Sequence, residues 1–473
     1  MKVILKFIPK IFPHTFFVIV FIAFTGLCLV GLNSCTPLKP RTEKIYWISP
    51  TVLPSVRPEM KTPGFWIGRL AEPDRIILDR QEINTLNQDI QKRLDLTKDI
   101  SELPEAFDGR ELLSDIKHWL FRFRDSGHYY RDDSRPAKPG FYTDLEQRMN
   151  LAAIQPRMRL KWGLVTTHTD QRLLPTLTPL YREAGDIYFD RLQNNRLDIG
   201  TPVAVLHQSD DAQWFWVMGP TSDGWVQADH VALCLRETLE NIKNAAFVTV
   251  VRDNASLYQN RTLTQYAGFA RMGTRFMLIG TSKSDPVAVM LPYRQKTGQL
   301  EMLNGYIKAG EIVQGSLAYT PRNIIEQAFE MLNAPYGWGG AHGDQDCSQF
   351  IQSIFSTVGI QLPRNSAGQA RVGRDLVTFE AIDPDRERLA MMISSGLPGT
   401  TILYMKGHVM LYLGDVMGHP YIIHELWAYL EPGIIDDRIR ATNRVVITDL
   451  ELGKGTGRGS LLQRLKTMRG VFN

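Results

Sequence analysis

The stretch from Pro335 to Gln369, PYGWGGAHGDQDCSQFIQSIFSTVGIQLPRNSAGQ, says most about the fold and chemistry of this chain. Its first part carries four glycines, which allow backbone to approach a ligand closely: Gly337, Gly339, Gly340 and Gly343. Apolar residues then recur at helical spacing: Phe350, Ile351, Ile354, Phe355 and Val358. The pattern predicts a glycine-rich loop that leads into a buried helix.

Cys347 is predicted to lie in the first turn of that helix. The unpaired N–H groups and the dipole at a helix start favour a thiolate. Asp346 is placed to cap the helix and Gly359 to end it. We therefore interpret Cys347 as a reactive nucleophile rather than a buried structural cysteine, which is the common alternative.

A nucleophilic thiol needs a base, and two histidines on consecutive apolar runs are the best candidates. His408 opens the run to Leu413, Gly414-Asp415 is predicted to turn the chain, and the run Pro420–Ile423 leads to His424. In an antiparallel pair, the start of one strand lies beside the end of the next. We expect His408 to act as the base and His424 to orient it. The Cys and His residues lack tight metal-ligand spacing, so neither a metal nor a cofactor is predicted.

The other residues divide into segments by pattern, and 473 residues predict about three domains. Residues 35–65 are Pro-rich, which is typical of an extended tether, and residues 66–158 carry a helical pattern, clearest from Glu111 to Phe123. Short apolar runs between turn residues predict two small β-barrels, over residues 159–236 and 245–314. Helix and strand signals mix over residues 318–473, so the fold class expected is α+β with several domains.

The N-terminus has the order of an export signal: lysines first, then the apolar run Phe16–Leu32, then small residues. It ends in Leu32-Asn33-Ser34-Cys35, which resembles a bacterial lipobox. We interpret residues 1–34 as a signal peptide and Cys35 as a lipid-carrying residue; an uncleaved membrane anchor is the alternative. The expectation is a periplasmic protein anchored by lipid, at the outer membrane of a Gram-negative bacterium, since Thr36 and not Asp follows the cysteine.

Two further cysteines, Cys234 and Cys347, lie beyond this segment. In an oxidising compartment they could form one disulfide, or remain a buried thiol and a reactive thiol. Cys234 lies in the apolar run Val231–Leu235, so we expect it to be buried and unpaired.

Composition excludes several classes of protein. Hydrophobic residues make up 44% and charged residues 22%, close to globular averages, which excludes a collagen, a wholly disordered chain and a multi-span membrane protein. The net charge is only +4, from 54 basic and 50 acidic residues. A dedicated nucleic-acid binder would carry a larger excess in one patch, so no nucleic-acid partner is predicted.

Four features, in this order, resemble the NlpC/p60 cysteine peptidases of bacterial cell walls. They are Pro335–Gly340 (PYGWGG), Asp346-Cys347-Ser348, Leu362–Ser366 (LPRNS) and the HVMLYLG run from His408. The chain departs from the family pattern at Gln349, where many members have Gly, and by an insertion over residues 370–399. The order of segments is similar to the subgroup with a helical N-terminal part, two bacterial SH3-type barrels and a papain-like catalytic domain.

This resemblance implies cleavage of the γ-D-Glu–diamino acid bond, with meso-diaminopimelate as the diamino acid, in murein peptides that bear a free N-terminal L-Ala. It assigns Asp346, Ser348 and Ser366 to substrate binding, and Asp170 and Trp216 of the first barrel to closing the cleft. Tyr336 is our candidate to stabilise the oxyanion together with the Cys347 N–H. Two alternatives remain: an N-acetylmuramoyl-L-alanine amidase, and a non-catalytic lipoprotein that binds murein through its barrels.

Overall fold

The computed structural model describes residues 45–472, so the predicted signal peptide, Cys35 and the first part of the tether lie outside the described residues. Residues from Trp47 onward form one compact unit. No helix within the described residues has the length and hydropathy needed to span a bilayer.

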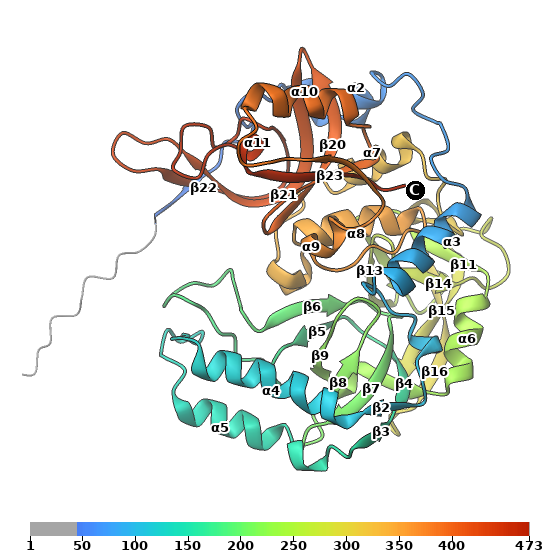
Figure 1. Ribbon diagram of the computed structural model, residues 1–473. Coiled ribbons are helices and arrows are strands. Elements are labelled where there is room, and N and C mark those ends of the chain that lie inside the picture. The colour runs from blue at the N-terminus through green and yellow to red at the C-terminus, as the bar shows by residue number, and fades with distance from the viewer. Residues whose placement is uncertain (1–44, 473) are drawn as a thin grey trace, which may run out of the picture. The chain divides into compact units, whose positions relative to one another are not determined.

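The C-terminal domain is built on a sheet of seven strands in the order β1-β22-β21-β20-β19-β23-β18. Figure 1 labels β20 to β23 of this sheet in red, close to α8. Helices α7 (Pro321–Glu330) and α8 (Cys347–Thr357) pack on each other, and α8 packs on β20 and β21. The strands are β1 (Tyr46–Ile48), β18 (Arg374–Thr378), β19 (Thr401–Met405), β20 (His408–Val416), β21 (His419–Glu431), β22 (Arg438–Asp449) and β23 (Leu465–Gly470). The short helices are α9 (Ser366–Gln369), α10 (Asp385–Ser395) and α11 (Leu461–Arg464).

Helix α8 begins and ends where its sequence predicts. The Asp346 side chain accepts hydrogen bonds from the N–H groups of Ser348 and Gln349, which caps the helix. Gly359 has a φ of +93°, the left-handed conformation that follows many helix C-termini. The apolar stripe of α8 is fully buried against the sheet. The local pattern therefore fixes Cys347 at the first turn of a core helix.

The turn between β20 and β21 differs from the prediction. Gly414 and Asp415 belong to β20, where the register of the β20–β21 pair shifts between Tyr412 and Gly414. The chain turns at Met417 and Gly418, both with positive φ, as a two-residue hairpin turn requires. The predicted turn at Gly414-Asp415 is wrong because this glycine serves a bulge inside the strand.

The insertion over residues 370–399 extends the sheet at one edge. Strand β18 pairs with β23, and α10 packs on β18, β21 and α11.

The first β domain is a sheet of seven strands in the order β10-β4-β7-β8-β9-β5-β6. The strands are β4 (Lys161–Val165), β5 (Thr169–Arg172), β6 (Gln193–Leu197), β7 (Pro202–Gln208), β8 (Trp214–Met218), β9 (Asp223–Gln227) and β10 (Val231–Cys234). Helix α6 (Arg236–Asn244) follows β10.

The second β domain consists of two small sheets around one core. Its sheets run β14-β11-β17 and β13-β12-β16-β15. The strands are β11 (Phe247–Val250), β12 (Asn254–Tyr258), β13 (Tyr266–Arg271), β14 (Arg275–Met277), β15 (Val287–Arg294), β16 (Leu300–Ile307) and β17 (Ile312–Gln314).

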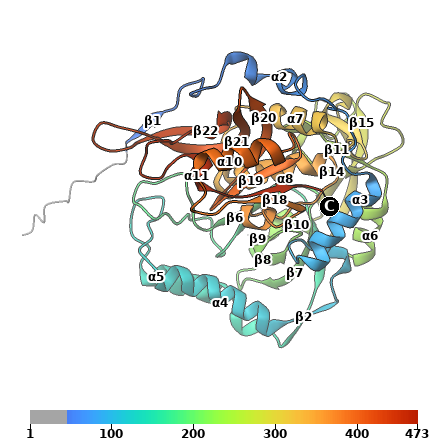
Figure 2. The same ribbon diagram turned by 45° about the horizontal axis from the view of Figure 1, so that its top comes forward.

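The segment before the first β domain divides between two hydrophobic cores. Helices α4 (Gly109–Asp125) and α5 (Pro139–Arg148) lie side by side and join the core of the first β domain (Figure 2). Helices α2 (Pro63–Ile67) and α3 (Arg80–Gln88) join the core of the C-terminal domain instead. The short strands here are β1 (Tyr46–Ile48), β2 (Ala106–Asp108) and β3 (Arg157–Arg159).

The second half of the predicted tether is packed rather than extended. Leu53, Val56 and Met60 are buried in the C-terminal core. Trp66 is buried beside them, and its indole N–H donates to the carbonyl of Met60. Pro58 and Pro63 each stand at the first position of a short helix. A high proline count therefore does not by itself distinguish an extended tether from a packed segment with short helices.

Candidate active site

Two buried histidines form a hydrogen-bonded pair on neighbouring strands. Leu411 of β20 lies opposite Ile423 of β21, so His408 and His424 are diagonal neighbours on one face of the sheet. Nε2 of His408 lies 2.7 Å from Nδ1 of His424, and Nε2 of His424 lies 3.2 Å from Oγ1 of Thr448 on β22. The assignment that leaves His408 able to act as a base has His408 donating to His424 and His424 donating to Thr448. It leaves Nδ1 of His408 as the ring nitrogen that takes up a proton.

Cys347 lies against the backbone of β20 immediately after His408. Its sulfur accepts a hydrogen bond from the backbone N–H of Val409, the residue after His408. Helix α8 thus holds the thiol against the first residues of β20. In the described part of the chain, Cys347 and Cys234 are both free thiols, so a disulfide between them is excluded here. Cys234 is half-buried, and burial raises the pKa of its thiol to about 11.

Burial favours the neutral forms of both the Cys347 thiol and the His408 imidazole before any reaction begins. Burial, and then the neighbouring Asp346 carboxylate, raise the pKa of the Cys347 thiol to about 12. Burial lowers the pKa of His408 to about 4, and it lowers that of His424 well below the ordinary value. A helix terminus contributes only about 0.3–1 kcal/mol, so the expected resting thiolate is not favoured at this depth. The thiol would lose its proton to His408 during attack rather than before it.

Asp346 belongs to a buried ion pair with Arg364. Nη1 and Nη2 of Arg364 donate to the two carboxylate oxygens at 2.9 and 2.7 Å. Burial alone would raise the pKa of Asp346, but Arg364 outweighs it and the pKa is lowered. The Ser348 hydroxyl also donates to Asp346 and accepts from Arg364.

These contacts revise the predicted substrate-binding roles. Asp346 and Ser348 already have partners inside the protein, so a blocked substrate amine would not strand an unpaired Asp346 charge. The sequence motif LPRNS contained Arg364, but the resemblance assigned only its serine. Ser366 is half-buried and begins α9, beside Asn365, which caps that helix.

The first β domain reaches the glycine-rich loop through strand β6. Nε2 of Gln193 donates to the carbonyl of Gly339 at 3.2 Å and to Asp170 at 3.0 Å. A side chain at Gly339 would clash with the Gln193 backbone, and one at Gly340 would clash with Arg196. Asp170 therefore lies one hydrogen-bonded residue away from the loop that leads to Cys347.

Trp216 does not belong to this site. Only 3% of its surface is exposed, and its ring packs edge-on against Trp225 in the core of the first β domain. The expectation that Trp216 closes the cleft is therefore wrong: inward alternation along β8 places it in the core.

An aromatic cluster of Tyr188, Phe189, Trp338 and Trp427 joins the two domains instead. Phe189, from the segment between β5 and β6, packs against Trp338 of the glycine-rich loop and Trp427 of β21, at centroid distances of 5.4 and 4.9 Å. Tyr188 also packs on Trp427, and the Arg191 guanidinium lies over the Trp338 ring. The adjacent aromatics Tyr188-Phe189 in a loop were the available sequence signal, because exposed aromatics in loops often mark contacts.

Tyr336 and Glu425 lie within electrostatic reach of the thiol. Burial, then Asp346 and Cys347, raise the pKa of Tyr336 well above its ordinary value. The phenol is therefore a neutral donor at physiological pH, as an oxyanion-stabilising role requires. Glu425, which follows His424 on β21, was not singled out in the sequence. It is fully buried, and burial raises its pKa well above the ordinary value.

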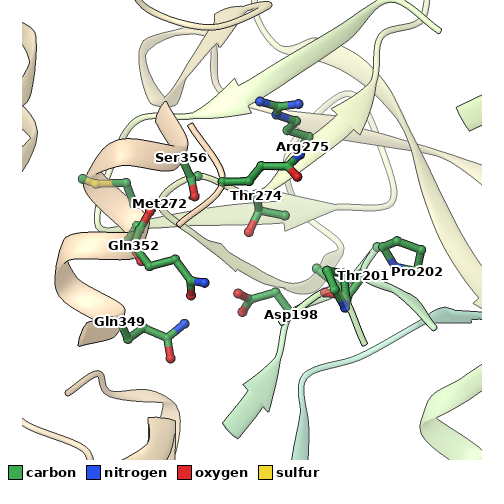
Figure 3. Close-up of a pocket in the computed structure, with 15 residues that line it drawn as sticks. Asp198, Thr201, Pro202, Met272, Thr274, Arg275, Gln349, Gln352 and Ser356 are labelled. Carbon is green, nitrogen blue, oxygen red and sulfur yellow. Dashed lines mark hydrogen bonds between the residues drawn. The ribbon is translucent and has the colours of Figure 1, made fainter. Parts of the chain in front are cut away.

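A separate cavity of about 270 Å³ lies where the two β domains meet α8 (Figure 3). Gln349 and Gln352 of α8 face Asp198 and Thr274 across it. Asp198 is paired with Arg271, so the cavity wall carries no free carboxylate there. Cys347, His408 and His424 are not among its lining residues. Within residues 45–472, no cluster of three or more His, Cys, Asp or Glu side chains is arranged to hold a metal ion.

Comparison with known proteins agrees with this architecture. The model of the NlpC/P60 family matches residues 333–426, and the model of the SH3b1-type SH3 domain matches residues 175–227. A solved NlpC/P60 endopeptidase from Photobacterium damselae subsp. piscicida has a TM-score of 0.73 and 18% sequence identity, and the match covers 90% of this chain and 99% of that one. At this identity the likeness shows the fold.

Two curated relatives are gamma-D-glutamyl-L-lysine dipeptidyl-peptidases. The protein from Bacillus subtilis is 33% identical over 94 residues, which cover 20% of this chain and 32% of the relative. The protein from Bacillus cereus is 26% identical over 200 residues, which cover 41% of this chain and 54% of the relative. The chain thus spans about a third and about half of the length of these relatives. Taken with the site geometry, the matches show that the chain carries an NlpC/P60 family cysteine-peptidase domain preceded by an SH3b-type domain.

Proposed function

We propose that this protein hydrolyses the γ-D-Glu–diamino acid bond of murein peptides, with Cys347 as nucleophile. The observation that carries the proposal is that the Cys347 sulfur meets the backbone N–H of Val409, the residue after His408, and that His408 is itself hydrogen-bonded to His424. The names of the two curated relatives support the γ-D-glutamyl bond, and a cell-wall peptide is the natural source of such a bond.

In the proposed reaction, Nδ1 of His408 takes the proton of the Cys347 thiol as sulfur attacks the γ-carbonyl of D-Glu. The oxyanion accepts hydrogen bonds from the Cys347 N–H and the Tyr336 hydroxyl. His408 then gives its proton to the leaving amine of the diamino acid, and a thioester remains on Cys347. Water, deprotonated by His408, hydrolyses the thioester and restores the thiol. His424, held by Thr448, keeps His408 in the required tautomer throughout.

A muramoyl–L-Ala amidase is the second candidate, and one observation favours keeping it. Because Arg364 neutralises Asp346, Asp346 is not an unpaired carboxylate that would demand a free substrate amine. A candidate to recognise an ammonium group is Asp170, which is half-buried and whose Oδ1 accepts a hydrogen bond from Gln193.

The test uses the chain without residues 1–34 and two matched variants, Cys347→Ala and Cys234→Ala. Each is incubated with L-Ala-γ-D-Glu-meso-diaminopimelate, its N-acetylated form and a muramoyl peptide, and the products are identified by mass spectrometry. We expect release of L-Ala-D-Glu by the wild type and by Cys234→Ala but not by Cys347→Ala. Release of a peptide with a free N-terminal L-Ala from the muramoyl substrate would instead identify an amidase. A wild type that cuts none of them contradicts both candidates.

We further propose that Cys35 carries lipid and holds the enzyme in the periplasm, where cell-wall peptides occur. The support is the order of charge, apolar run and Leu-Asn-Ser-Cys in the sequence. Metabolic labelling with a tagged fatty acid checks this, with Cys35→Ala compared with Cys28→Ala. Equal labelling of both variants would contradict lipidation at Cys35.

A further inference from the structure

One buried side chain of the first β domain reaches into the hydrogen-bond network beside Cys347. Oδ1 of Asn195, on β6, accepts a hydrogen bond from Nε of Arg364 at 2.7 Å. The same guanidinium holds both oxygens of Asp346 and the hydroxyl of Ser348. Asn195, a residue of the first β domain, is therefore hydrogen-bonded through Arg364 to Asp346 and Ser348, the two neighbours of Cys347.

The orientation of the Asn195 amide is set from within the first β domain. Its Nδ2 donates to Oγ of Ser222 at 2.8 Å, and that hydroxyl donates to Oε1 of Gln171 at 2.6 Å. Gln171 is fully buried and also donates to the Ser222 carbonyl. A flipped amide would point an N–H at the Arg364 N–H, which can only donate, so only the observed orientation satisfies Arg364. The barrel thus presents an oxygen, in a fixed position, to Arg364.

We propose that Asn195 is a positioning residue for the active site, acting through Arg364 on Asp346. Only the measurement of kcat and KM rests on the proposed function; the measurement of Cys347 alkylation does not. Asp346 caps α8, at whose first residue Cys347 stands, and it also accepts the N–H of Gly339 in the glycine-rich loop. By fixing the position of Asp346, Arg364 therefore also fixes the start of α8 relative to the glycine-rich loop.

The physical reason lies in the burial of Arg364. Only about 6% of the residue is exposed, so its N–H groups depend on protein acceptors. Without Asn195, the Nε–H would lack its partner, and the guanidinium could regain one only by moving away from Asp346. The negative charge of Asp346 would then be less neutralised beside Cys347. Since Asp346 raises the pKa of the thiol and Arg364 lowers it, deprotonation of Cys347 would become harder.

The chain offers a matched control on the same strand. Asn194 is the residue before Asn195, but its Nδ2 donates to the Asp223 carbonyl within the first β domain. We would compare Asn195→Ala, Asn194→Ala and Asn195→Asp in the chain without residues 1–34. Aspartate keeps the acceptor that faces Arg364, and the Ser222 hydroxyl can turn to donate to it.

Two readouts separate positioning from general stability. The first is kcat and KM on the peptide that the wild type cleaves: we expect Asn195→Ala to lower kcat/KM roughly tenfold or more, chiefly through kcat, with Asn194→Ala near wild type and Asn195→Asp largely recovered. The second needs no substrate. The rate of Cys347 alkylation by iodoacetamide across pH 7–10, followed by mass spectrometry, should fall in Asn195→Ala and stay unchanged in Asn194→Ala.

A double-mutant cycle with Arg364→Lys completes the test, because losses that pass through Arg364 should not add. The inference is overturned if Asn195→Ala matches Asn194→Ala in both readouts, or if its loss adds fully to that of Arg364→Lys. A wild type that cleaves none of the peptides, with alkylation still slowed in Asn195→Ala, would remove the proposed function and leave the positioning role standing.

Discussion

Burial favours the neutral forms of His408 and Cys347, and this sets the pH range expected of the proposed reaction. A general base acts only when unprotonated, and burial lowers the pKa of His408 to about 4. We expect kcat/KM to stay level from pH 8 down to about pH 5 and to fall only as His408 gains a proton near pH 4. Initial rates over pH 3–8 check this, with circular dichroism at each pH as a control for folding. An acid limb near 6.5, the ordinary histidine value, would contradict the burial of the pair.

Glu425 should make stability depend on pH. Its side chain is fully buried. Within residues 45–472, neither of its carboxyl oxygens has a hydrogen-bond partner. Its folded pKa is raised well above 4.5, so the folded state keeps a proton that the unfolded chain releases. Stability from this group is full below about pH 4.5 and is lost as pH rises toward the folded pKa, by up to about 1.4 kcal/mol per pH unit.

Glu425→Gln should remove that dependence, because the amide does not titrate. Urea unfolding at pH 5 and pH 8 should show a smaller loss of stability for Glu425→Gln than for the wild type. Glu326→Gln, at an exposed position of α7, should behave as the wild type does. An equal change in unfolding free energy between pH 5 and pH 8 for all three proteins would show that Glu425 finds a partner for its charge.

At the scale of a single element, the end of α8 depends on one backbone conformation. Gly359 has a φ of +93°, and a Cβ there would meet Ser316, Arg275 and Ile83 only at ordinary contact distances of 3.4 Å or more. The cost of Gly359→Ala is therefore mainly backbone strain, about 1–2 kcal/mol. Gly310→Ala is the control, because its Cβ would meet nothing within 4 Å. Thermal unfolding should separate the two variants, and equal midpoints would contradict the strain.

At the scale of the whole molecule, the stretch before α3 is a structural part of the C-terminal domain. Trp66 is 1% exposed, and its ring packs against Tyr421 of β21. We expect Trp66→Ala to cost about 3–5 kcal/mol of unfolding free energy. Trp47→Ala, at a half-exposed position 19 residues earlier, should cost far less. Chemical denaturation measures both, and a small loss for Trp66→Ala would favour the extended tether that the prolines suggested.

Features that depend on near neighbours in the chain could be predicted. The start of α8 at Cys347 follows from its cap residue and its apolar period, both carried within about a dozen residues. The nearness of His408 and His424 follows from antiparallel pairing of consecutive strands, although the turn between them was misplaced. Motif order pointed to the family whose domain models match the chain.

Contacts between domains, and the burial of individual side chains, could not be predicted from the sequence and depend on the packed structure. Arg364 takes Asp346 and Asn195 as partners, although Asn195 lies 169 residues earlier in a strand whose polar sequence QNNRL gives no sign of it. Trp216 lies in the core of the first β domain because of inward alternation along β8, and it is Phe189, from a loop, that packs against Trp338. The candidate nucleophile, its helix and the two neighbouring histidines could be found from the sequence alone, since short-range backbone geometry sets their positions. Partners and pKa values depend on burial, which exists only once the domains have packed.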